Sequence, residues 1–191
     1  MKRYRPYCPG YIVLYVLTLL SFSDVVYTSY RQLKGLNNDY MSSFSFFAYF
    51  VFFMALCYVW QYARAQVCFN GNKMRVAFPI NIRPKQGQPR AMIIYRQGDL
   101  DMKFVDKTID LKLVTRYGYV EDLGYEKLDQ SRGGDKSKLF PVKEVAFITS
   151  ENKRYHMNAG IYSARQQKEI FTRIREITGI EPEGKLKEVL Q

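Results

Sequence analysis

The residues able to perform acid–base or metal chemistry are few, and their spacing is uninformative. Asp99, Asp101, Asp106 and Asp110 lie close together in the chain, and neighbouring carboxylates can transfer protons or bind Ca²⁺. Lysines are interleaved with them, and on a strand Asp99 and Asp101 would share a face with Lys103. This pattern favours a solvated, charge-balanced face of a sheet over a catalytic pair.

Histidine and cysteine chemistry is equally sparse. The single histidine is His156, and the three cysteines, Cys8, Cys57 and Cys68, are irregularly spaced. Such a set indicates neither a zinc site nor a disulfide framework. The sequence also contains no glycine-rich phosphate loop, no nucleophile elbow and no His-Glu-x-x-His motif. We therefore expect a protein that is not an enzyme and that needs no cofactor and no metal.

Basic side chains are the best candidates for a binding site. The formal net charge is +11, and clusters of Lys and Arg bind anionic lipid headgroups by charge and hydrogen bonds. A positive flank that only fixes the orientation of a membrane protein is the alternative. No recognised nucleic-acid motif accompanies the charge, so nucleic acid is not an expected partner. The candidate lipid-binding or partner-binding residues are Lys73, Arg75, Arg83, Lys85, Arg90 and Arg96.

These basic residues follow two apolar runs, 11–22 and 44–60. A membrane-spanning helix needs about 20 mostly apolar residues. No charged residue occurs in 41–63, and none in 6–23. We predict a transmembrane hairpin in residues 1–63, with spans at about 7–27 and 43–63 and a connection of roughly twenty residues between the apolar runs.

Charge and aromatic residues predict the orientation of the hairpin. Basic residues are more numerous before the first run and after the second than between them, which favours cytoplasmic amino and carboxyl termini in a multi-pass plasma-membrane protein. Cleavage after Ser23 as a signal peptide is the alternative, and it would leave one span. Aromatic side chains near the presumed interfaces are the expected membrane anchors: Tyr11, Tyr27, Trp60 and Tyr62.

Asp24 lies near the far end of the first run. A carboxylate in hydrocarbon is costly and is often functional. A position among the lipid headgroups is the favoured interpretation. A role in ion movement would fit the alternative function, an oligomeric transport or pore component, and a homo-oligomer is compatible with either function.

Residues 64–179 predict one α+β domain. Asn70-Gly71 between two strand-like runs is a strong hairpin signal, and Asn152-Lys153 is a second expected turn. Residues 127–138 are polar and glycine-containing, which is typical of a loop. The expected strands are 67–69, 74–78, 91–95, 101–105, 109–115, 117–123, 142–149 and 154–158.

A helix is predicted over 163–178. Ser163 and Gln166 have the spacing of a capping box, and Gly179 is a C-terminal stop signal. Apolar residues recur at helical spacing: Ile170, Phe171, Ile174 and Ile177. This helix should cap a small β barrel or sandwich, whereas the polar tail 180–191 should fray.

Two spans, then strands, then one C-terminal helix resemble the bacterial pleckstrin-homology-like membrane proteins. The most similar part is 155–163, YHMNAGIYS, leading into the helix. In size and order the chain also resembles the EbsA-like family of small membrane proteins from Gram-positive cocci. The resemblance implies a pleckstrin-homology-like cytoplasmic domain on a membrane tether. We expect it to act as a scaffold or accessory subunit of a cell-envelope assembly, with anionic lipids and a protein as partners.

Overall fold

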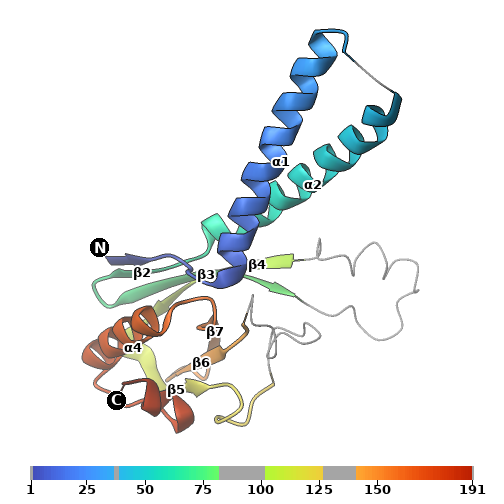
Figure 1. The fold of residues 1–191 in the computed structure, drawn as a ribbon. Helices are drawn as coiled ribbons and strands as arrows, with labels where there is room; N and C mark the ends of the chain where they lie inside the picture. Colours follow the sequence, from blue (N-terminus) through green and yellow to red (C-terminus); the bar gives the residue numbers. More distant parts are fainter. Residues whose placement is uncertain (1, 37–38, 82–101, 127–140, 191) are drawn as a thin grey trace, which may run out of the picture.

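The computed structural model describes residues 2–36, 39–81, 102–126 and 141–190. It shows an α+β protein with an apolar N-terminal helix and small antiparallel sheets. Two long helices rise together from one end of a β-rich domain (Figure 1).

The helices are α1, Pro9–Leu33, and α2, Asp39–Arg64. Their contacts include Phe22 with Phe52, whose ring centroids are 5.8 Å apart, and Ser29 Oγ with the Tyr49 hydroxyl at 2.8 Å. Both helices extend beyond the predicted spans 7–27 and 43–63 toward each other, because α1 continues to Leu33 and α2 begins at Asp39. Hydropathy marks where a helix suits lipid, but a helix continues as long as its backbone hydrogen bonds do.

The first sheet has the strand order β1-β2-β3-β4 and is antiparallel throughout. Its strands are β1, Lys2–Tyr4, β2, Gln66–Asn70, β3, Lys73–Asn81, and β4, Met102–Asp110. The predicted turn at Asn70-Gly71 joins β2 to β3, with Gly71 at φ 55°. Sequence reasoning missed β1, since three residues carry no periodic pattern and the strand forms only against β2.

The second sheet has the order β5-β6-β7, again antiparallel. Its strands are β5, Val114–Tyr119, β6, Glu144–Thr149, and β7, Arg154–Asn158. Asn152 at φ 57° forms the predicted β6–β7 turn. The predicted strand 91–95 and loop 127–138 lie outside the described residues.

One predicted strand, 109–115, is wrong. Its alternating pattern is interrupted by a 3₁₀ turn, η2, Leu111–Leu113, and the Asp110 side chain accepts a hydrogen bond from the Lys112 amide at 3.1 Å. Ile109 and Leu111 are fully buried, as the alternation predicts, but Leu113 is exposed. The turn carries the chain from β4 to β5, and so from the first sheet to the second.

Helix α4, Ala164–Thr178, confirms the helix predicted over 163–178. The Ser163–Gln166 capping box is formed, Gly179 adopts a left-handed conformation at φ 69°, and Ile170, Phe171 and Ile174 are fully buried. The apolar stripe of α4 therefore packs into the core, where the stacked rings of Tyr117 and Phe147 have centroids 5.8 Å apart.

The expectation of a fraying tail is wrong. The tail forms a 3₁₀ helix, η3, Gly184–Leu190, and Leu186 is fully buried in the core. Glu183 pairs with Arg116 at 2.6 and 2.8 Å, and the Lys185 amide donates to Asp122 Oδ2 at 2.7 Å. A single leucine in a polar segment was too weak a signal for burial, but these partners on and after β5 hold the tail in place.

Candidate membrane-facing site

The exterior of the two helices is strongly apolar. Among the described residues, the exposed large hydrophobic side chains all lie between Tyr7 and Trp60 except for Leu113. Among the described residues, α1 is the one helix that is long and apolar enough to cross a membrane, whereas the sequence predicts two spans. Apolar surface of this extent is unfavourable in water and indicates a lipid or protein cover.

The four predicted membrane anchors, three tyrosines and one tryptophan, divide into two pairs. Tyr27 and Trp60 are exposed on the helices, at 55% and 67%, as an interfacial aromatic belt requires. Tyr11 instead packs against Tyr62 with ring centroids 6.1 Å apart, and Tyr62 is 8% exposed and belongs to the domain core. The Tyr11–Tyr62 pair therefore packs the junction between the helices and the domain.

Basic residues collect on the face of the first sheet that points away from the core. On β3, Met74 and Val76 are buried whereas Lys73 and Arg75 are exposed, so the two basic residues share the outer face. The strand register brings Arg3 of β1 into line with Arg75, with Cys68 of β2 between them.

Arg64, the last residue of α2, adds a fourth cation at this face. Its guanidinium lies 4.5 Å from the ring centroid of Phe104. Phe104 is opposite Pro79 in the register, and by strand alternation Pro79 is on the same face of β3 as Lys73 and Arg75. We call Arg3, Arg64, Lys73 and Arg75 the basic face. Figure 1 shows the sheet that carries it at the foot of the two helices.

Two acids moderate the charge of the basic face. Asp106 accepts two hydrogen bonds from Arg75, Nε to Oδ1 at 2.8 Å and Nη2 to Oδ2 at 2.5 Å, and Asp110 lies opposite Lys73 in the register. The Arg75 hydrogen bonds lower the pKa of Asp106, and Asp106 in turn raises the pKa of Arg75. Because both side chains are more than a third exposed, the pair contributes about 0–1 kcal/mol.

The predicted binding residues are therefore only partly placed. Lys73 and Arg75 lie on the basic face, while Arg83, Lys85, Arg90 and Arg96 lie outside the described residues. Sequence reasoning missed Arg3 and Arg64 as members of the face. Only the pairing of β1 with β2 could have revealed Arg3, and that pairing spans more than 60 residues of chain.

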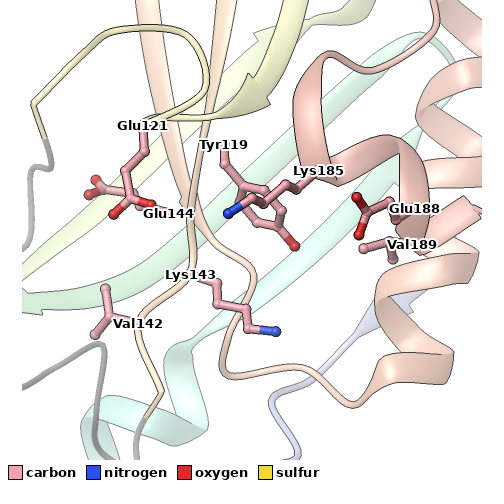
Figure 2. A pocket seen from close by; sticks show the side chains of 8 residues that line it. All are labelled: Tyr119, Glu121, Val142, Lys143, Glu144, Lys185, Glu188 and Val189. Carbon is pink, nitrogen blue, oxygen red and sulfur yellow. The ribbon is translucent and has the colours of Figure 1, made fainter.

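A pocket of about 590 Å³ is lined by residues of β5, β6 and η3 and their flanking segments (Figure 2). Its lining combines three glutamates with two lysines, one tyrosine and two valines: Tyr119, Glu121, Val142, Lys143, Glu144, Lys185, Glu188 and Val189. The volume suits a small ligand, but charges of both signs share the lining.

Glu144 is the buried acid of this pocket. Its side chain is fully buried, and its Oε1 lies 3.0 Å from His156 Nδ1. The lone histidine thus has a hydrogen-bond partner across β6 and β7. In the part of the chain that the structure describes, no group of three His, Cys, Asp or Glu side chains could hold a metal ion.

Comparisons with known proteins add no relative. A scan against protein-family models gave no match, and searches of curated proteins and of solved structures gave none either. The fold and the surface define the class: an α+β protein with small antiparallel sheets and an apolar amino-terminal helix of membrane-spanning length.

Proposed function

We propose that this chain is a non-enzymatic integral membrane protein whose β domain lies against the inner leaflet of the plasma membrane. The domain would serve as a scaffold or accessory subunit of a cell-envelope assembly. The observation that carries the proposal is the position of the apolar surface. It is concentrated on two helices that rise together from a domain whose own large apolar side chains are mostly buried (Figure 1).

The pairing of β1 with β2 supports two membrane crossings. These strands flank the helices in the chain and lie side by side in one sheet. If α1 crosses the bilayer, α2 must therefore cross back. Its 26 residues make a helix of about 39 Å, long enough for a hydrocarbon core of about 30 Å. Cleavage after Ser23 would remove β1 from this sheet, which argues against a signal peptide.

The strand order supports a pleckstrin-homology-like layout. A four-strand antiparallel unit and a three-strand unit precede one helix whose apolar stripe packs into the core. This order of elements supports the proposed β sandwich with a C-terminal helical cap, in which the helical pair would be inserted between the first and second strands.

The basic face supports contact with anionic lipid. A well-placed Lys or Arg near an anionic leaflet contributes about 1 kcal/mol. Arg3 precedes α1 by a few residues, and Arg64 ends α2, so the ends of the helices hold this face close to the bilayer surface.

Sidedness is the experiment that tests the proposal. Leu36→Cys lies at the distal end of the helical pair and Lys187→Cys on η3, and both positions are exposed. We expect a membrane-impermeant maleimide to label Leu36→Cys in intact cells and Lys187→Cys only after permeabilisation. The unsubstituted chain, in which Cys8 and Cys68 are buried, gives the background. Labelling of Lys187→Cys in intact cells would refute the inner-leaflet position, and equal access at both sites would refute the hairpin.

A further inference from the structure

Asp24 is the one charged residue between Arg5 and Arg31. Helix α1 continues nine residues beyond it to Leu33, which adds about 13 Å of helix. Arg31, the next charged residue along α1, is about 10 Å farther from the domain than Asp24. The acid therefore lies within the helix rather than at its end, and it lies at membrane depth if α1 spans the bilayer.

The carboxylate of Asp24 has no partner in the part of the chain that the structure describes, neither a hydrogen bond nor an ion pair. The nearest cation along the helix is engaged elsewhere. Arg31 donates from Nη2 to the Leu36 carbonyl at 3.1 Å, and its guanidinium lies 5.9 Å from the ring centroid of Tyr27. An ionisable group in hydrocarbon is costly, and it usually pairs with another group and has a function.

Apolar neighbours place Asp24 on an outward side of α1. Residues at alternating spacings of four and three share one side of a helix, and this is the spacing at which helices pack together. The set that contains Asp24 is Val13, Leu17, Leu20, Asp24 and Tyr27, and we call it the Asp24 stripe. Its four apolar members are 43–63% exposed, and Asp24 itself is partly exposed. Helix α2 therefore leaves this side of α1 open.

The chain itself cannot supply the missing cation. There is no lysine or arginine between Arg5 and Arg31, and none between Asp39 and Arg64. A second copy that packed on the same stripe would bring two acids together instead of an acid and a base. Lipid chains would cover the apolar members of the stripe but would leave the carboxylate unpaired.

We propose that the Asp24 stripe binds a membrane-spanning helix of a partner protein, and that Asp24 pairs with a lysine or arginine of that helix at the same depth. The pair would be favourable because no water competes for either charge in hydrocarbon. This inference rests on the proposed function, and it names the class of partner in the proposed assembly. That partner is a membrane protein with a basic residue inside a spanning helix.

Energy transfer in phosphatidylcholine vesicles tests the pairing, with the single tryptophan, Trp60, as the donor. The probes are two acceptor-labelled, leucine-rich spanning peptides without tryptophan, one with a lysine at the depth of Asp24 and one with leucine there. We expect the full chain to bind the lysine peptide about fivefold or more tightly than the leucine peptide, the effect of a polar contact between membrane helices. Asp24→Asn should remove this preference. Asp39→Asn, the matched control, makes the same charge change at the first residue of α2 and should retain it.

Three results would overturn the inference. They are equal binding of the two peptides by the unsubstituted chain, a lysine preference that persists in Asp24→Asn, and self-association of the chain that Asp24→Asn abolishes. The last result would assign the acid to an interface between two copies.

A labelling control separates this inference from the proposed function. Leu19 is 63% exposed on α1 and lies outside the stripe, so a membrane-impermeant maleimide should reach Leu19→Cys in the same vesicles only if α1 is outside the lipid. Labelling above that of the unsubstituted chain would overturn both the membrane position of α1 and the pairing. A shielded Leu19→Cys together with equal binding of the two peptides would overturn the pairing alone.

Discussion

Tyr117 has one of the largest fully buried side chains of the core, and its hydroxyl donates to the Ile180 carbonyl at 3.0 Å. Burial raises the pKa of this phenol above its ordinary value of about 10, and the charge of Glu181 raises it further. Below pH 10 the phenol is neutral in both states, so its contribution to stability is complete. Above pH 10 the unfolded chain ionises first, and the free energy of unfolding falls.

Tyr117→Phe therefore has a pH-dependent effect. At pH 8 we expect the variant to be about 1 kcal/mol less stable, because it lacks one hydrogen bond. Above pH 10 the difference should narrow by up to about 1.4 kcal/mol per pH unit, since the variant cannot ionise at this position. Thermal unfolding of both chains in micelles at pH 8 and pH 11, followed by circular dichroism, measures the difference. A difference that stays constant would contradict the prediction.

At the residue scale, the sequence predicted what depends on near neighbours. Ser163 and Gln166 are three residues apart, and Gly71 and Asn152 adopt the conformations that their turns require. The partners of Arg75 and Glu183 could not be predicted, because Asp106 and Arg116 reach them only through the register of distant strands.

At the scale of elements, the tail shows what one buried side chain can do. Leu186 is fully buried as a member of the hydrophobic core, whereas the adjacent Lys187 is exposed. We expect Leu186→Ala to lower the free energy of unfolding by about 2–5 kcal/mol, through lost burial and a residual cavity. Lys187→Ala, the control, should change it by less than about 0.5 kcal/mol.

Chemical denaturation of the full chain in micelles distinguishes these variants. Equal stability of Leu186→Ala and Lys187→Ala would mean that η3 is detached in solution, as the polar composition of the tail had indicated.

Elements whose sequence signals lie close together in the chain could be predicted, whereas elements that depend on distant strands could not. Helix α4 was predicted with its boundaries, because capping residues, periodicity and the glycine stop all lie within seventeen residues of chain. In contrast, β1 and η3 consist of short segments whose burial depends on β2, β5 and the core. The basic face could be predicted only in part for the same reason, since β1 supplies Arg3.

At the scale of the whole molecule, the basic face should respond to lipid charge. We expect amide hydrogen exchange in 73–78 of β3 to slow when the full chain is moved from phosphatidylcholine nanodiscs to nanodiscs that also contain phosphatidylglycerol. The difference should disappear in 1 M salt, where the Debye length is about 3 Å. The full chain is required, because a domain cut at Arg64 would lack β1 and the buried Tyr4.

A charge variant tests whether the basic face is responsible. Arg3→Gln with Lys73→Gln should remove most of the lipid dependence, since Arg75 is already paired with Asp106. Lys187→Gln on η3, at the opposite end of the domain from the helices (Figure 1), should leave it intact. Slowed exchange that persists in 1 M salt would instead indicate contacts that do not depend on charge.

The pairing of β1 with β2 also has a consequence for biogenesis. During synthesis β1 leaves the ribosome first, and its partner follows only after both helices have been made. If both helices insert correctly, the two strands meet on one side of the membrane and the sheet can be completed. If one helix fails to insert, β1 and β2 lie on opposite sides of the membrane and β2 lacks its neighbouring strand. Completion of this sheet would thus report correct insertion, and quality-control proteases could recognise a chain in which it remains open.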